Sequence, residues 1–180
     1  MSLLEWISAE PSLTLQGQGV RLRPPRRRDY AEWAALRQAS RAFLQPWEPT
    51  WAPDELTPNG YSRRMAAWRR GRELDQMYAF FVYRERDDAL TGGITVNNIR
   101  RGVAQMGTIG YWCAQAHARN GYTLAALRAV IPFAFRSLGL HRLEAACLPD
   151  NEASASLLLK AGFTEEGYAK AYLKINGDWR

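Results

Sequence analysis

Lysine, cysteine and long apolar runs are scarce in this chain of 180 residues. The two cysteines, Cys113 and Cys147, fall in predicted strands without the spacing of metal ligands, so we expect a reducing compartment and no metal site. No apolar run approaches the about 20 residues needed to cross a membrane. Residues 1–10 carry two glutamates where a targeting leader would be basic. These absences favour a cytoplasmic protein that does not associate with membranes.

Arginine supplies nearly all of the positive charge, because only three of the 24 basic residues are lysines and the net charge is +6. The densest arginine clusters lie at 26–28, 63–64 and 69–70. An excess of positive charge favours polyanionic surroundings such as phosphates or a ribosome surface. A solvated face of an arginine-rich protein is the simpler alternative, and no nucleic-acid-binding motif accompanies the clusters. Both interpretations remain open at this point.

The length of the chain fits one domain with a substantial core. We expect residues 1–180 to form this domain, with 1–19 as an N-terminal extension. A first strand is predicted at 20–23, and Asp29 is placed to cap the helix that follows.

The middle of the chain predicts one helix and an antiparallel meander. Tyr61, Met65 and Trp68 repeat with helical spacing, and Gly71 is expected to end their helix. Three strand-like runs separated by turn residues follow at 78–83, 90–99 and 104–112.

A tight turn at residues 119–123, Arg-Asn-Gly-Tyr-Thr, follows a strand that ends in Gly110-Tyr111-Trp112. The helix after the turn carries an apolar stripe of period 3.6, formed by Leu124, Leu127, Ile131, Ala134, Phe135 and Leu138. A glycine turn that leads into a helix exposes free backbone N–H groups, and such groups bind phosphate. The alternative is an ordinary connection between a strand and a helix.

The last segment predicts a strand at 142–147, a helix at 152–161 and a strand at 168–175. Asn176-Gly177 is a strong hairpin signal, yet only three residues follow it. We therefore expect the return strand to be missing, either through truncation or because another chain supplies it. The resulting open edge would allow a monomer or a strand-exchanged dimer.

Several motifs together resemble those of GCN5-related N-acetyltransferases (GNAT), in particular the branch of ribosomal-protein-alanine N-acetyltransferases of the RimJ and RimL type. The motifs are Gly110-Tyr111-Trp112, Gln45-Pro46-Trp47-Glu48-Pro49, and the segments at 139–145, 151–154, 160–163 and 167–173. The resemblance implies a single-domain α/β (α+β) fold with a mixed, mostly antiparallel central sheet and helices on both faces. The fourth and fifth strands of this sheet are expected to splay apart, and the C-terminal strand is expected to be missing.

The same resemblance implies an enzyme that transfers the acetyl group of acetyl-CoA to a primary amine without a metal. The acceptor expected for this branch is the N-terminal α-amino group of a ribosomal protein. Two alternatives remain: a small-molecule amine as acceptor, or a catalytically weak CoA-binding or ribosome-associated module.

The resemblance also implies which residues hold acetyl-CoA. Backbone groups of the splayed strand would bind the pantetheine arm and polarise the thioester carbonyl. The turn would hold the diphosphate, and the start of the later helix would contact the pantetheine. These cofactor-binding residues are Tyr111, Trp112, Cys113, Arg119, Asn120, Gly121, Tyr122, Thr123, Asn151 and Ser154. Asn151 is equally suited to capping its helix.

The chain departs from the family pattern at the phosphate-binding turn and at the position of the residue that protonates the leaving thiolate. Ala118 and Thr123 occupy the first and last positions of the phosphate motif, and Arg119 replaces a frequent glycine. Thr123 is expected to crowd the turn and weaken cofactor binding. The tyrosine that many members use to protonate the thiolate maps to Leu158, which leaves Ser154, a water or no dedicated acid.

Two carboxylates compete for the role of general base. Glu144 lies on the predicted strand at 142–147 and shares a face with Ala146, the position of a catalytic glutamate in some relatives. Glu48, in the tryptophan-containing loop, is the rival. An ion pair of purely structural importance is the alternative for either residue.

Overall fold

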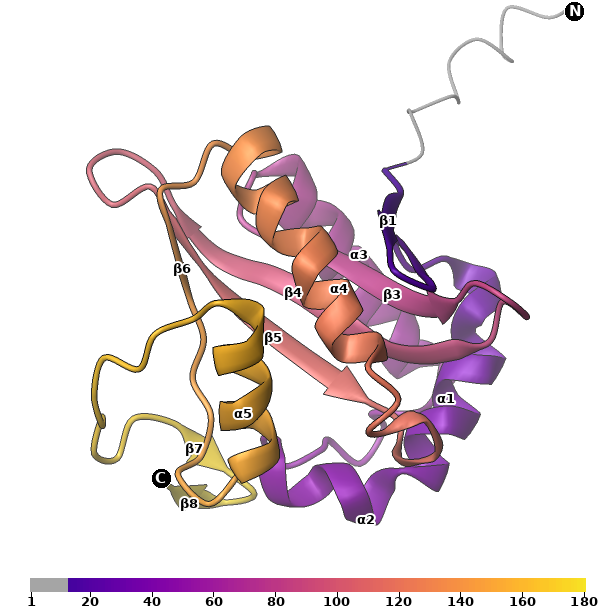
Figure 1. Ribbon diagram of the computed structural model, residues 1–180. Coiled ribbons are helices and arrows are strands. Elements are labelled where there is room, and N and C mark those ends of the chain that lie inside the picture. The colour runs from indigo at the N-terminus through magenta and orange to yellow at the C-terminus, as the bar shows by residue number, and fades with distance from the viewer. Residues whose placement is uncertain (1–12) are drawn as a thin grey trace, which may run out of the picture.

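A twisted sheet of six strands forms the centre of the molecule (Figure 1). The computed structural model describes residues 13–180. The strands are adjacent in chain order, and only the last pair, β5 and β6, is parallel. From β1 to β6 they span Leu15–Gly17, Val20–Arg23, Tyr78–Arg84, Leu90–Arg100, Met106–Cys113 and Arg142–Glu144. The predicted antiparallel meander is confirmed as β3, β4 and β5.

The sheet begins earlier than we expected. β1 lies within the predicted extension at 1–19 and pairs with β2, so that Leu15 stands opposite Leu22. A strand of three residues is too short to produce a recognisable alternation of apolar residues. The remainder of the predicted extension, 1–12, lies outside the described residues.

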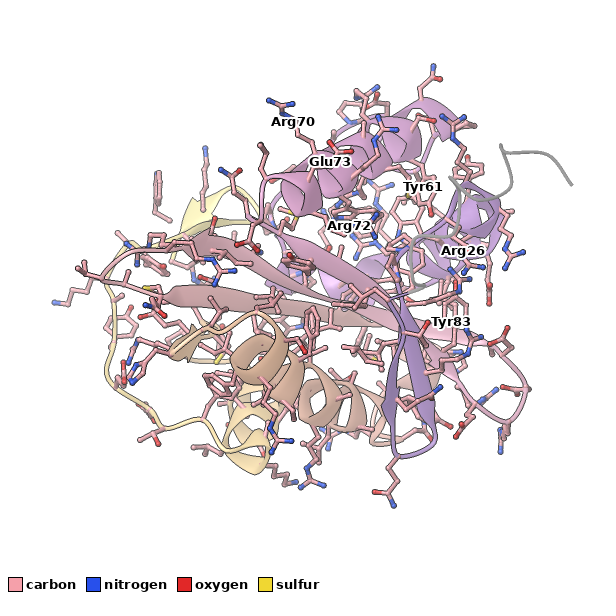
Figure 2. The ribbon with its side chains drawn as sticks, turned by 90° about the horizontal axis from the view of Figure 1, so that it is seen from above. Arg26, Tyr61, Arg70, Arg72, Glu73 and Tyr83 are labelled. Atoms are coloured by element: carbon pink, nitrogen blue, oxygen red, sulfur yellow. The ribbon has the colours of Figure 1, made fainter. Side chains whose placement is uncertain are left out.

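Helices cover both faces of the sheet, as the resemblance implied. On one face lie α4 (Tyr122–Pro132), continued by the π-helical η4 (Phe133–Ser137), and α5 (Glu152–Ala161). On the other face lie α1 (Tyr30–Ala39) and α3 (Pro58–Glu73); Figure 2 shows α3 and α4 on opposite sides of the sheet. The short helices are η1 (Arg27–Asp29), α2 (Arg41–Leu44), η2 (Gln45–Trp47) and η3 (Gln115–His117).

Each face has its own apolar core, and β5 contributes to both by alternation. Ile109 and Tyr111 point toward α4 and join the larger core, in which Phe80, Ile94 and Leu127 are buried. Trp112 points the other way and packs against the smaller core under α1 and α3. Residues of odd number in this part of β5 therefore face α4, and residues of even number face the opposite side.

The buried stripe of α4 differs from the predicted one. Its buried residues are Ala126, Leu127, Val130, Phe133 and Ala134, whereas Phe135 is 41 % exposed. Pro132 stands inside the helix, and the next turn is π-helical, with the N–H of Leu138 bonded to the carbonyl of Phe133. A proline cannot donate the usual backbone hydrogen bond, and the wider π turn shifts the angular position of every later side chain.

Two predicted helix ends are wrong in detail. Asp29 precedes α1, but its side chain does not cap the helix and instead accepts hydrogen bonds from Arg23. Gly71 does not end α3, which continues to Glu73. A Cβ at Gly71 would lie 2.7 Å from the Cβ of Met77, so this glycine permits close packing and does not terminate the helix.

The prediction that the final hairpin lacks its return strand is wrong. β7 (Lys174–Ile175) turns at Asn176-Gly177 and pairs with β8 (Asp178–Trp179) of the same chain. The hairpin is also fixed to the body, because the N–H of Asn176 donates to the carbonyl of Glu48 at 2.9 Å. Each arm has only two residues in strand structure, and residues 168–173 of the strand predicted at 168–175 are irregular. Because the return strand comes from the same chain, the argument for an exchanged strand loses its basis.

No helix in the described part of the chain is long and apolar enough to span a membrane.

Candidate active site

β5 and β6 separate after only three paired positions. The parallel ladder joins Met106, Gly107 and Thr108 to Arg142, Leu143 and Glu144. β5 then continues to Cys113, whereas β6 ends at Glu144, shorter than the strand predicted at 142–147. Figure 1 shows the two segments diverging from their paired ends, with α5 between them. Along residues 109–113, the edge of β5 that faces away from β4 is therefore free to bind an extended ligand.

The turn at 119–123 lies directly beyond the end of β5. Arg119 and Gly121 both have positive φ angles, 60° and 81°. Asn120 stabilises the turn by donating from its side-chain amide to the carbonyl of Ala118 at 3.0 Å. Gly121 is the N-cap of α4, and no side chain caps that helix. The N–H groups of its first turn are consequently available to an anion, which the positive end of the helix dipole attracts.

Thr123 contacts the end of β5. Burial raises the pKa of the Cys113 thiol, and a hydrogen bond with the Thr123 side chain opposes part of that rise. A Cβ placed on Gly121 would meet no atom within 4 Å. The Thr123 side chain therefore lies close to Cys113 at the end of β5, and the space beside Gly121 is open.

The start of α5 is connected to β5 by a hydrogen bond between side chains. Asn151 caps the helix, and its Oδ1 accepts from the N–H of Ser154 at 3.1 Å. The Oγ of Ser154 lies 2.6 Å from the hydroxyl of Tyr111. Leu158 is buried in the body of α5, 8 % exposed. Ser154 is thus the hydroxyl that α5 presents toward the unpaired part of β5.

Glu144 faces the opposite side of the sheet. Leu143 packs against the core under α4, so the alternation of β6 directs Glu144 away from it. Its ladder partner Thr108 lies on that same side, as does Gly110, where a Cβ would meet nothing within 4 Å. The Glu144 carboxylate accepts a hydrogen bond from Arg142 at 2.8 Å, and its side chain is 39 % exposed. The cleft between β5 and β6 therefore has Ser154 on one face and a carboxylate on the other.

A groove of about 720 Å³ runs along β6, α5 and the C-terminal segment. Glu144, Thr108, Trp47 and Tyr172 are among its lining residues. Within the described chain it does not extend to the turn at 119–123. The groove is open to solvent, so it offers a route for an acceptor to Glu144.

Glu48 is held by three hydrogen bonds. Both terminal nitrogens of Arg37 donate to its carboxylate at 2.7 Å, and the indole N–H of Trp51 donates at 2.7 Å. The guanidinium of Arg37 also lies 4.3 Å from the ring centre of Trp51 and 5.1 Å from that of Trp112. These three donors occupy both oxygens of the Glu48 carboxylate and fix its orientation.

Arg37 is the important residue that our reading of the sequence missed. It is only 6 % exposed and joins α1, the loop after η2 and the end of β5 through its contacts. Arg37 follows the buried Trp33 by four positions, so the helical period alone would have placed it on the inner face of α1.

Residues 13–180 contain no group of three or more His, Cys, Asp or Glu side chains able to hold a metal ion.

Comparison with known proteins agrees with this geometry. The model of the acetyltransferase (GNAT) domain matches residues 20–164. The chain belongs to the GNAT acetyltransferase family. Its β5–β6 cleft and uncapped α4 are thus parts of an acetyltransferase, and the chain is an enzyme of that class.

The GNAT relatives of this chain include ribosomal-protein acetyltransferases. "Probable N-acetyltransferase YjcK" of Bacillus subtilis is 36 % identical over 165 residues, which cover 92 % of this chain and 91 % of the relative. The [Ribosomal protein uS5]-alanine N-acetyltransferase of Escherichia coli is 32 % identical over 141 residues, which cover 78 % and 73 %. The structure of Mycobacterium smegmatis RimJ in complex with CoA-disulfide superimposes with a TM-score of 0.86 at 32 % identity and covers 94 % of this chain and 82 % of that one.

Proposed function

We propose that this acetyltransferase moves the acetyl group of acetyl-CoA to the N-terminal α-amino group of a ribosomal protein. The observation that carries the proposal is the divergence of β5 and β6. It leaves the edge at 109–113 unpaired between an anion-binding turn and an open groove. One chain thus offers a site for the thioester donor and a separate route for the acceptor.

The residues present fit acetyl-CoA. The turn at 119–123 offers free N–H groups, the dipole of α4 and the exposed Arg119 to the diphosphate. Backbone groups of Tyr111, Trp112 and Cys113 would pair with the pantetheine and polarise the thioester carbonyl. Asn151 uses its Oδ1 to cap α5 and keeps its side-chain N–H₂ for the ligand. A relative of 32 % identity is described as a complex with CoA-disulfide, which supports this assignment.

Glu144 is the better candidate for the general base. It lines the groove together with Thr108, and within residues 13–180 its hydrogen-bonding partner is Arg142, which also pairs with Glu166. Glu48, by contrast, is occupied by Arg37 and Trp51. Glu144 would take the proton of the incoming amine directly or through one water.

A protein acceptor is favoured over a small amine by the shape of the groove and by the relatives. The groove is open to solvent, whereas small ligands usually occupy enclosed sites. One relative of 32 % identity acts on the alanine N-terminus of ribosomal protein uS5.

Two of the arginine clusters meet between η1 and α3, which supports an acceptor bound to a ribosome. Arg27 and Arg69 line the same hollow of about 320 Å³. In the described chain, Arg27, Arg28 and Arg70 form no ion pair, whereas Arg63 is paired with Asp54. Figure 2 shows Arg70 pointing away from the sheet. Guanidinium groups without an ion-pair partner are suited to phosphate oxygens.

Reversing these charges is expected to weaken ribosome binding. The variant R27E/R28E/R70E should bind purified ribosomes at least about tenfold more weakly. Its slope of log affinity against log salt should be shallower by about 2–3, because each lost phosphate contact removes nearly one released ion. The control R128E/R136E changes exposed arginines on the α4 side and should bind like the wild type. Equal ribosome binding by both variants would refute the proposal that Arg27, Arg28 and Arg70 contact the ribosome.

The function itself is tested by titration calorimetry with acetyl-CoA, followed by acetylation assays. We expect micromolar affinity with one site per chain, and faster acetylation of peptides with the N-terminal sequences of ribosomal proteins than of polyamines or amino acids. If the protein binds acetyl-CoA but acetylates small amines faster than peptides, the proposed acceptor changes from a ribosomal protein to a small amine. Binding without turnover would favour the ribosome-associated module, and absent binding would refute the donor site.

A further inference from the structure

Tyr111 and Ser154 form a side-chain pair across the candidate cleft, from β5 to the first turn of α5. Their oxygens are 2.6 Å apart, which is a short distance for two neutral hydroxyl groups. Tyr111 belongs to the stretch of β5 that β6 leaves unpaired. The pair therefore lies where the thioester sulfur would pass between the strand and the helix.

The geometry allows either oxygen of this hydrogen bond to donate, and we assign the phenol as the donor from its acidity. A phenol is a much stronger acid than an aliphatic alcohol, so the Tyr111 O–H donates and the Ser154 Oγ accepts. Burial raises the pKa of Tyr111, while the hydrogen bond to Ser154 lowers it in part. The phenol consequently remains protonated throughout the neutral range and can donate at every working pH.

This arrangement orients the remaining proton of Ser154. Its Oγ is held by Tyr111, and its backbone N–H is held by Asn151. The serine O–H must then point away from the phenol. A hydroxyl that accepts from one donor also becomes a better donor itself, because hydrogen bonds in a chain polarise one another.

We propose that Tyr111 is a positioning residue that directs the Ser154 hydroxyl to the leaving sulfur and replaces its proton. The inference rests on the donor half of the proposed function and is independent of the acceptor. In this step the amine nitrogen forms a bond to the carbonyl carbon, and the carbon–sulfur bond breaks with its electron pair on sulfur. The sulfur takes the Ser154 proton, Ser154 takes the Tyr111 proton, and Tyr111 recovers one from solvent. The amine loses its proton to Glu144, which releases it to solvent.

The test compares two leaving groups in the variant Tyr111→Phe. With acetyl-CoA, kcat is expected to fall about 10- to 100-fold. This is less than the full contribution of a general acid, because Ser154 itself remains in place. With the acetyl thioester of 4-nitrothiophenol, whose thiolate is stable without a proton, the loss in kcat/KM should be less than about threefold. Calorimetric affinity for CoA should stay within about twofold, because phenylalanine keeps the ring.

Two further variants separate positioning from simple packing. The double variant Y111F/S154A should be no slower than Ser154→Ala, since both residues act in one relay. Tyr78→Phe removes a phenol that donates to Asp75 at 3.0 Å on the same face of the sheet and should leave kcat unchanged.

An equal loss with both thioesters, additive losses in the double variant, or the same loss in Tyr78→Phe would overturn the inference. Any amine that the wild type acetylates serves as acceptor, so failure of the ribosomal-protein proposal does not affect the test. Absence of CoA binding by the wild type would overturn the inference and the proposed function together.

Discussion

Replacing Asp29 with asparagine is expected to lower the free energy of unfolding by about 3–5 kcal/mol, because it leaves a buried guanidinium without its counter-charge. Arg23 is 6 % exposed and Asp29 is 5 % exposed. Two nitrogens of Arg23 donate to the carboxylate at 2.7 and 2.8 Å, and the N–H of Arg26 donates at 2.7 Å. For a chain of this size the melting temperature should fall by about 10 °C, measured by calorimetry at pH 7.

The exposed pair of Arg84 and Asp87 provides a matched control. It has the same two-bond geometry, at 2.8 and 2.7 Å, but the Asp87 side chain is 43 % exposed. Asp87→Asn should lower the melting temperature far less than Asp29→Asn does, because water screens an exposed ion pair. Similar losses in both variants would mean that burial is not the cause.

The loss caused by Asp29→Asn should also depend on pH. Burial raises the pKa of Asp29, but the hydrogen bonds from Arg23 and from the backbone of Arg26 outweigh burial and leave this pKa below its usual value. A lowered pKa adds stability above the unfolded value of about 3.9. The difference between wild type and variant should therefore be constant from pH 7 to about pH 5 and shrink below about pH 4. A difference that does not shrink as the pH falls below about 4 would contradict this origin.

Replacing Glu144 with glutamine is expected to lower kcat by about 10²–10⁴, the usual contribution of a general base. The side chain is partly exposed and its partner Arg142 retains Glu166, so the melting temperature should change little. The deficit should shrink above about pH 8, where the α-amine of the acceptor loses its proton to solution. Steady-state kinetics with a peptide acceptor from pH 6 to 9 measure both effects.

Glu48→Gln is the control for the second carboxylate. It should cost about 2–3 kcal/mol of stability, because Arg37 loses a charged partner. Assayed well below its melting temperature, this variant should keep more than about a tenth of the wild-type kcat. If Glu48→Gln instead shows the large kinetic loss and Glu144→Gln does not, the base assignment is reversed.

Elements with a strong local signal were predicted well. The helix expected at 152–161 is α5, since Asn151 caps it and Gly162 follows it in the left-handed conformation. The meander at 78–112 is confirmed because alternating apolar runs separated by turn residues leave few other structures open. The family was likewise correctly inferred, because its motifs combine local turns and caps with residue identities.

Features that depend on contacts distant in sequence could not be predicted. The direction of the Asp29 side chain was decided by its hydrogen bonds with Arg23, which also donates to the hydroxyl of the buried Tyr83. The closure of the last hairpin was decided by a bond from Asn176 to Glu48, 128 positions away in the chain. β6 is shorter than predicted because its pairing with β5 stops at Glu144. No local pattern in residues 142–147 reveals where this pairing stops.

The sequence by itself determined the GNAT family, the meander at 78–112 and the helix at 152–161, because these follow from local periodicity, turn chemistry and motif identity. Only the tertiary structure decided that Glu48 is bound by Arg37, that Glu144 faces the groove and that Tyr111 meets Ser154. The physical reason is that the surroundings of a polar side chain are set by whichever elements pack around it. In this protein those elements are α1, β5, α5 and the C-terminal hairpin, which are far apart in the chain.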